Sequence, residues 1–217
     1  MKKRFLSLLC VLALCLGLLP VTALAAAEGA PSSLYVGNYQ ITNSDTPTYL
    51  KAGSTHGSLE DVRQTDWTVK YDPSTATLTL SGATIKGGSD VVSIPYGSGI
   101  YAQGSNQPVT LTIELIGENT ITGTYGIFLN AEINASSYGT DASLTITSEN
   151  NGSLQVSGSN HGIYVKSGKG DASLTITNAS DDAKHTQTYS SYAGLCVPAG
   201  ADTITPPNTP LSTHDRV

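Results

Sequence analysis

The sequence predicts an all-β fold, a short right-handed parallel β-helix of about four coils with three strands per coil and an N-terminal β cap. Three observations predict it. A sequence pattern recurs every 30 to 33 residues, each repeat contains short runs of alternating apolar and polar residues, and no convincing helical period follows the leader. The 22 glycines among 217 residues suit the many turns of such a fold.

The first 27 residues predict a secretory signal peptide. Cationic Lys2–Arg4 precede an apolar run, Phe5–Leu19, and small residues follow at Ala23–Ala27. Without them, eight Lys and Arg remain against 17 Asp and Glu, a formal net charge of −9, which argues against nucleic acid as a partner. No later apolar run approaches the roughly 20 residues of a membrane span. The chain is therefore expected to be secreted, with no membrane partner after cleavage.

Cysteine usage predicts a chain without an internal disulfide. Cys10 and Cys15 leave with the signal peptide, so that Cys196 remains alone. Burial or repetition must then hold the fold together.

Residues 28–75 predict the N-terminal β cap. Leu34–Thr42 and Trp67–Tyr71 have the composition of strands, and Asp72–Thr75 fits a type I turn with proline at its second position. We expect Trp67, Val69 and Tyr71 to share one face and close the end of the core.

The repeats are predicted over residues 76–200. Each repeat has a strand centred on a Leu, an intermediate strand, and a strand that follows Gly. The members of the first set are 76–80, 109–113, 142–146 and 172–176; of the second 83–85, 119–121 and 154–156; of the third 99–102, 126–129, 162–165 and, more loosely, 194–197. Alternation points Leu78, Leu80 and their equivalents inward. Asn119 points inward on the same register, beside Ile121, where it would need backbone partners, so a structural role is expected.

The third set predicts an aromatic column. Tyr101, Phe128, Tyr164 and then Cys196 face outward, one above another, about one strand spacing apart. Exposed flat rings are suited to stacking on sugar CH groups, so Tyr101, Phe128 and Tyr164 are the candidate carbohydrate-binding residues. The alternative is that β-propensity and cross-strand packing alone favour aromatic residues there.

A second candidate site consists of Asp141 and Asp171, which occupy equivalent turns 30 residues apart. Two stacked carboxylates with nearby carbonyls are candidate ligands for Ca²⁺. The alternative is ordinary turn chemistry, in which each aspartate bonds its own backbone. The histidines lack metal-ligand spacing and are expected in solvent: His56, His161, His185 and His214.

Residues 201–217 predict a flexible, Pro-rich tail. Two interpretations remain open at this end. Either the segment 180–192 covers the last coil, or the chain is a fragment of a longer solenoid.

The repeated pattern between Leu111 and Phe128, together with the opening Leu34–Asn38, resembles secreted clostridial proteins with β-helix carbohydrate-binding domains, whose fold is related to that of pectate lyases. The resemblance extends from about Leu34 to Gly200. It implies an extracellular, calcium-assisted polysaccharide-binding module on a Gram-positive cell surface, and its motifs carry over no binding residue.

Catalysis is not expected. A polysaccharide lyase needs a cationic base beside calcium ligands, and after the leader the only arginines are Arg63 and Arg216. Asn160–Gly162 matches part of one polygalacturonase element, but the companion acidic elements are absent. The sequence therefore predicts a non-catalytic module that binds extracellular polysaccharide, with a structural or adhesive stalk segment as the alternative. It predicts no oligomeric state.

Overall fold

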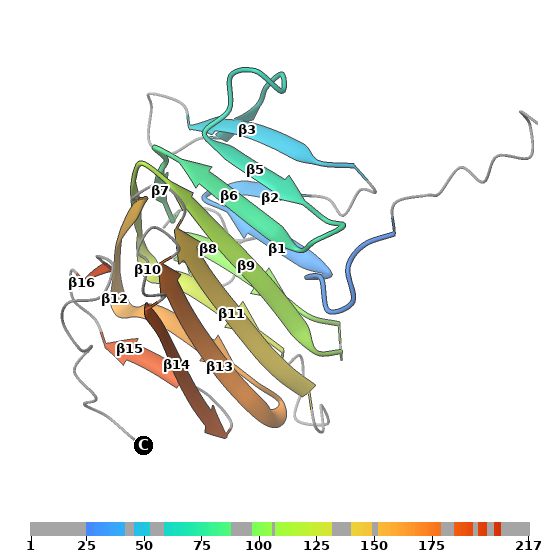
Figure 1. Cartoon of the computed structure of the whole chain (residues 1–217), viewed down its shortest axis with the longest axis vertical. Helices are drawn as coiled ribbons and strands as arrows, with labels where there is room; N and C mark the ends of the chain where they lie inside the picture. The colour runs from blue at the N-terminus through green and yellow to red at the C-terminus, as the bar shows by residue number, and fades with distance from the viewer. Residues whose placement is uncertain are drawn as a thin grey trace, which may run out of the picture.

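The computed structural model describes residues 25–41, 46–52, 59–87, 97–105, 107–131, 140–148, 152–178, 185–192, 195–198 and 202–204 (Figure 1). These residues form strands and turns without an α-helix, which confirms the all-β prediction. Among them, no helix is long and apolar enough to cross a membrane. The predicted signal peptide lies almost entirely outside the described residues.

One sheet, called sheet B here, contains eight strands in the order β14-β13-β11-β9-β6-β5-β3-β4. It forms the front of the molecule in Figure 1. Its members in chain order are β3 (Thr48–Ala52), β4 (Leu59–Asp61), β5 (Val69–Asp72), β6 (Thr77–Ser81), β9 (Val109–Ile116), β11 (Thr140–Ser148), β13 (Lys169–Asn178) and β14 (His185–Tyr192).

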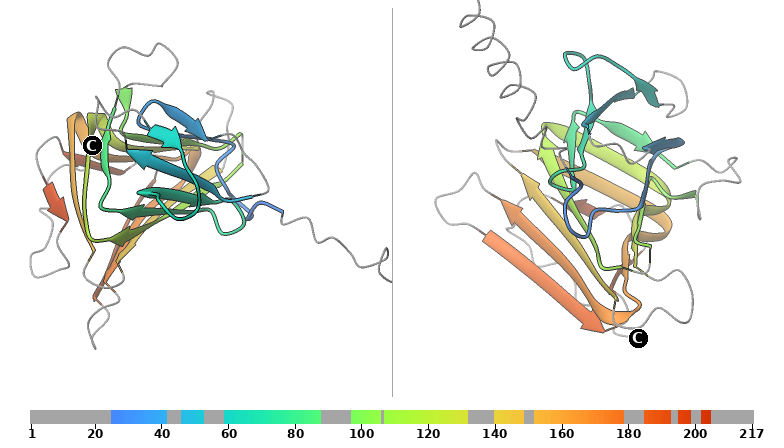
Figure 2. Two further views of the ribbon diagram at one scale, coloured as in Figure 1. Left: turned by 90° about the horizontal axis from the view of Figure 1, so that it is seen from above. Right: turned by 90° about the vertical axis from the view of Figure 1, so that its right-hand side faces the viewer.

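The other sheet, sheet A, has the order β15-β12-β10-β8-β1-β2, with β16 beside β12 and β7 beside β10. Its members are β1 (Ser33–Val36), β2 (Tyr39–Ile41), β7 (Thr84–Lys86), β8 (Ile100–Gln103), β10 (Glu118–Asn130), β12 (Ser153–Lys166), β15 (Leu195–Pro198) and β16 (Asp202–Ile204). From β9 to β13 the chain alternates between the two sheets, and Figure 2 shows the sheets from two further directions.

Equivalent strands of successive repeats pair in parallel. Leu111, Leu144 and Leu174 are in register on β9, β11 and β13. In sheet A the second and third sets are continuous in β10 and β12, which pair in parallel with a register shift between Gly123 and Tyr125. The predicted recurrence of all three strand sets is therefore present between these repeats.

The first repeat differs in register. Leu78 pairs with Ile113, two residues beyond the position that the sequence alignment predicts. The antiparallel hairpin of β5 and β6 holds β6 from its other side, and the amide of Thr112 bonds the carbonyl of Ala76. Because the shift is an even number of residues, the same side chains still point inward.

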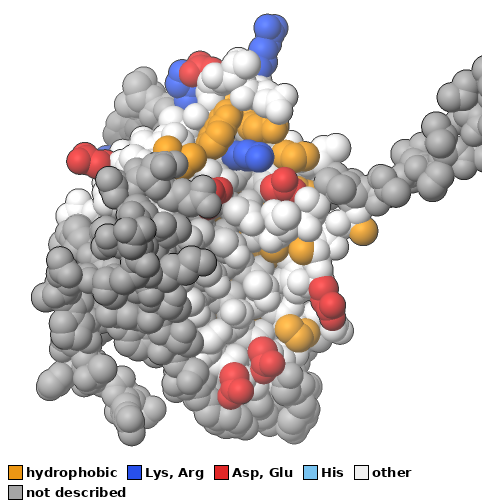
Figure 3. Space-filling model, viewed as in Figure 1, with side chains coloured by type: hydrophobic (Ala, Val, Ile, Leu, Met, Phe, Trp, Pro, Cys, Tyr) orange, Lys and Arg blue, Asp and Glu red, His pale blue; other side chains and the backbone are white. Residues whose placement is uncertain are grey.

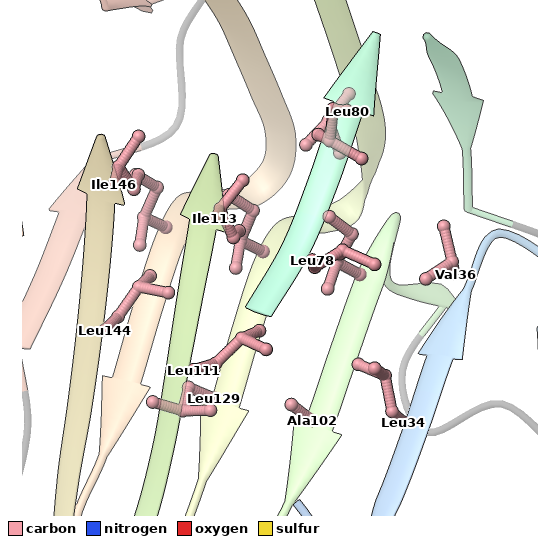
Figure 4. Close-up of a cluster of buried hydrophobic side chains, with 14 of the residues drawn as sticks. Leu34, Val36, Leu78, Leu80, Ala102, Leu111, Ile113, Leu129, Leu144 and Ile146 are labelled. Atoms are coloured by element: carbon pink, nitrogen blue, oxygen red, sulfur yellow. The ribbon is translucent and has the colours of Figure 1, made fainter. Parts of the chain in front are cut away.

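The predicted inward side chains form the core between the sheets (Figure 4). Leu78, Leu111 and Leu144 on sheet B are fully buried, and they face Ala102 and Leu129 on sheet A. Burial of the whole alternating set confirms the assignment of faces for the described repeats. Side chains of this kind supply the main favourable term in folding, because each removes apolar surface from water.

Glycine recurs before the third strand set because successive backbones approach closely there. A Cβ on Gly99 would lie 2.7 Å from the carbonyl oxygen of Gly126, and one on Gly126 would lie 2.5 Å from that of Gly162. Only a residue without a side chain fits at these levels, so packing explains the repeated Gly-Ile pattern.

Asn119 is buried, 2 % exposed, and links three successive levels of the structure. Its Oδ1 accepts a hydrogen bond from the amide of Ala83 at 2.8 Å. Its Nδ2 donates to the carbonyls of Gly117 at 3.0 Å and of Ile116 and Ser153 at 3.2 Å. The predicted structural role with backbone partners is confirmed.

The N-terminal strands are antiparallel. β3, β4 and β5 extend sheet B beyond β6, and β1 and β2 extend sheet A beyond β8. Val69 and Tyr71 are buried as predicted, but Trp67 is not part of the core. It precedes the first residue of β5, and its partly exposed ring packs against Tyr49, so the prediction for Trp67 is wrong.

The C-terminal strands are antiparallel as well. β14 pairs with β13, and β15 and β16 pair with β12, all in the antiparallel sense. The prediction that 194–197 continues the parallel repeat is therefore wrong in direction, although Cys196 does pair with Tyr164. β16, at Asp202–Ile204, lies within the segment predicted as a flexible tail. The segment 205–217 lies outside the described residues.

Candidate functional site

The predicted aromatic column exists, and β1 lengthens it. Tyr101, Phe128 and Tyr164 are in register on β8, β10 and β12, and Tyr35 on β1 pairs with Tyr101. Ring centroids are 6.2 Å apart for Tyr35 and Tyr101, 5.3 Å for Tyr101 and Phe128, and 5.0 Å for Phe128 and Tyr164. These separations are typical of interacting aromatic pairs.

The predicted exposure of the column is wrong for two of its three residues. Tyr101 is 2 % exposed and Phe128 is 4 % exposed, whereas Tyr164 is partly exposed. Phe128 has rings on several sides, since Tyr101, Tyr125 and Tyr164 all lie within 5.3 Å of it by centroid distance. Much of the column therefore stabilises itself by packing, as the structural alternative proposed.

Two further rings, Tyr125 and His161, join the column where β10 and β12 change register. Tyr125 pairs with His161, with centroids 5.5 Å apart and planes 10° apart. Both also stack on Tyr164, at 5.8 Å and 5.2 Å. Tyr125 directly precedes Gly126, and His161 directly precedes Gly162. Because these two glycines are equivalent in successive repeats, the sequence contained a signal that Tyr125 and His161 would be neighbours.

We define the outer aromatic cluster as Tyr35, Tyr101, Tyr125, Phe128, His161 and Tyr164. Of these, Tyr35 is partly exposed at one end of the column, and Tyr125, His161 and Tyr164 are partly exposed at the other and nearly parallel to one another. The prediction that His161 lies in solvent is corrected, because its partly exposed imidazole packs against both Tyr125 and Tyr164. Its Nδ1 is buried and makes no hydrogen bond within the described part of the chain.

Two asparagines bring amide groups to the cluster. Nδ2 of Asn160 donates to the Tyr125 hydroxyl at 3.1 Å, and Nδ2 of Asn130 donates to the Tyr101 hydroxyl at 3.4 Å. Asn160 is exposed, whereas Asn130 is buried. The accessible end of the cluster thus combines ring surface with phenol, imidazole and amide groups.

The predicted metal ligands Asp141 and Asp171 lie on adjacent strands and are both exposed. Oδ1 of Asp141 accepts a hydrogen bond from the backbone amide of Asp171 at 2.8 Å. This bond links β11 to β13 across 30 residues, so the two aspartates lie in strands and not in the predicted turns, and the bond is not the local one that the alternative interpretation expects. Within the described ranges, no three His, Cys, Asp or Glu side chains gather in a group that could hold a metal.

Two carboxylates supply at most four of the roughly six to eight oxygens that Ca²⁺ takes. The side chains present at Asp141 and Asp171 therefore do not make a calcium site by themselves. Calcium binding at this pair of strands stays a prediction.

No family model, curated protein or solved structure matches this chain. The resemblance to secreted carbohydrate-binding β-helix proteins consequently remains a prediction from the repeated residues.

Proposed function

We propose that this protein is a secreted, non-catalytic β-helix module that binds extracellular polysaccharide. Each repeat would form one coil, and the antiparallel strands β1 to β5 would cap the N-terminal end. Support for the coil comes from the alternation of the chain between two sheets and from the parallel pairing of equivalent strands. A rigid stack of this kind presents fixed side-chain positions to a long, repetitive ligand.

The observation that carries the binding proposal is the accessible end of the outer aromatic cluster. Tyr125, His161 and Tyr164 present partly exposed ring surface, and Asn160 lies beside them at hydrogen-bond distance from Tyr125. Sugars combine apolar CH groups with hydroxyls, and aromatic groups with polar handles complement both. We therefore move the proposed contact from the buried rings, Tyr101 and Phe128, to this end of the column.

The test is retention of the chain without residues 1–27 on a panel of insoluble polysaccharides. Tyr125→Ala combined with Tyr164→Ala is expected to reduce retention at least tenfold, since the pair removes two of the three partly exposed rings at this end of the column. Tyr35→Ala is the matched control, because it removes a ring from the far end of the same column. Equal retention of all three proteins, with thermal melts showing that each is folded, would exclude this surface.

A parallel arm adds a calcium chelator. The predicted calcium site would be supported if the chelator lowers retention of the wild-type chain and excess Ca²⁺ restores it. The chelator should then have no effect on the retention of the variant that combines Asp141→Asn with Asp171→Asn. Unchanged retention would remove it from the proposal.

The second candidate function is a structural or adhesive stalk segment, and the burial of Tyr101 and Phe128 favours it. A column whose rings cover one another stiffens the stack without any ligand. Under this function the aromatic variants lose stability, and the wild-type chain shows no retention on any polysaccharide of the panel.

A further inference from the structure

The outer face of sheet B is a second surface of interest, because hydroxyl side chains form regular rows on it. Three of its residues, Thr112, Thr145 and Thr175, are in register on adjacent strands and all partly exposed. A second row, two residues earlier along each strand, contains Thr110, Ser143 and Ser173. The hydroxyls align well enough that Ser173 Oγ donates to Ser143 Oγ at 3.1 Å.

These six residues, which we call the hydroxyl face, form a regular grid. Strands are about 4.8 Å apart and alternate residues along a strand about 6.7 Å apart. Each Thr presents a hydroxyl and a methyl group, so the grid offers hydrogen bonds and apolar contact at the same intervals. Figure 3 shows this side of the molecule, where much of the described surface is white, the colour of backbone and of side chains that are neither charged nor hydrophobic.

An aromatic pair lies at the N-terminal end of the same sheet. Tyr49 on β3 and Trp67 just before β5 are partly exposed, with centroids 6.3 Å apart and planes tilted by 55°. Because the rings are tilted, they do not cover each other face to face. The row that begins at Tyr49 continues through Lys70 and Thr79 to Glu114 on β9, two residues along that strand from Thr112, so it runs beside the hydroxyl face.

The charged residues on and around the hydroxyl face indicate which class of ligand it could bind. Neither row of the hydroxyl face contains a charged residue, and the acids Asp141 and Asp171 lie at its margin. Beside it, Lys70 and Glu114 contribute one charge of each sign on either side of Thr79, and Glu114 accepts a hydrogen bond from the Thr79 hydroxyl at 3.0 Å. Near the aromatic pair, Lys51 is already paired with Asp66 at 2.6 Å. This arrangement offers no cluster of cations to a polyanion and suits a neutral chain that carries many hydroxyls.

We infer that the hydroxyl face together with Tyr49 and Trp67 binds a neutral, unbranched polysaccharide in extended form, lying across the strands along the stack. This inference rests on the proposed function and names a second surface and a ligand class for it. From β3 to β13 the face spans five strand spacings, about 24 Å, so several sugar units would lie on it at once. Many weak contacts in register then add to a useful affinity.

The test compares two triple variants in which Thr becomes the isosteric, β-branched Val. The first is Thr112→Val, Thr145→Val and Thr175→Val on the hydroxyl face. The second, a matched control on the strands of the other sheet, changes residues that are also exposed or partly exposed: Thr84→Val, Thr120→Val and Thr122→Val. Probes are insoluble xylan, mannan and mixed-linkage glucan, with polygalacturonate as the acidic comparison.

The hydroxyl-face variant is expected to bind its best neutral polysaccharide at least about tenfold more weakly than wild type, from the loss of three hydrogen bonds. The control is expected to stay within about twofold of wild type, the scatter allowed for surface substitutions away from the site. Trp67→Ala, at a residue outside the buried core, should weaken binding to the same polysaccharide, and Trp67→Phe should restore part of it.

The outcomes separate the two proposals. If wild type binds a neutral polysaccharide and the hydroxyl-face variant binds it equally well, the inference fails while the proposed function stands. If wild type prefers polygalacturonate, the neutral ligand class is wrong. If wild type binds nothing on the panel, the proposed function itself fails.

Discussion

Replacement of Asn119 by Ala tests whether a single buried amide holds successive levels of the stack together. The side chain is the hydrogen-bond partner of the Ala83 amide, and that residue is 1 % exposed. The carbonyls of Ile116 and Gly117 keep other donors, the amides of Gly82 and Ser153. The main loss is therefore at Ala83.

The magnitude follows from that inventory. An orphaned buried amide costs about 1–3 kcal/mol, and the lost bond to the Ser153 carbonyl adds about 0.5–1.5 kcal/mol. We expect Asn119→Ala to lower the free energy of unfolding by about 1.5–4.5 kcal/mol. Asn160→Ala, the same substitution at an exposed position, should change it by less than about 0.5 kcal/mol.

The assay is equilibrium unfolding in urea, followed by circular dichroism, on the chain without residues 1–27. Both variants should keep the wild-type m-value, so that the shift in midpoint reports stability. Equal midpoints for Asn119→Ala and wild type would refute the reasoning, because they would mean that Ala83 finds another partner at no cost.

Three further predictions concern other packed positions. Burial raises the pKa of Tyr71 to about 12 from its ordinary 10.0, so the unfolded chain releases this proton first as pH rises. About 2–3 kcal/mol of the free energy of unfolding should therefore disappear between pH 10 and 12. Tyr71→Phe should not show this loss in alkaline unfolding curves. Gly126→Ala should lower the urea midpoint by an amount equivalent to about 1–3 kcal/mol, since its Cβ would lie 2.5 Å from the Gly162 carbonyl oxygen; an unchanged midpoint would contradict the close approach. Phe128→Ala should cost about 3–5 kcal/mol in the same assay, whereas a cost below about 1 kcal/mol would show that the ring is not packed as described.

The sequence was sufficient for the core of the repeats. Period-two alternation has only two phases, and apolar residues such as Leu111 and Ile113 occupy one of them, so the inward face was determined. Asn119 could be predicted for the same reason, since its place beside Ile121 in that alternation left it inside and in need of backbone partners. Both inferences use only the pattern of residues within a single strand.

Features that depend on several strands could not be obtained in this way. The burial of Tyr101 reflects rings from both neighbouring strands, and Tyr125 packs against Phe128 next to the register shift between β10 and β12. The direction of β15 was also beyond the sequence, because a four-residue apolar run has the same pattern in either direction. The candidate site moved along the aromatic column for these reasons.

Adsorption of the wild-type chain to insoluble polysaccharides tests the proposed function most directly. We predict saturable binding to at least one polysaccharide of the panel, weakened at least tenfold by Tyr125→Ala combined with Tyr164→Ala and unchanged by Tyr35→Ala. Absence of saturable binding to every polysaccharide, by a protein shown to be folded, would contradict a binding function and favour the stalk.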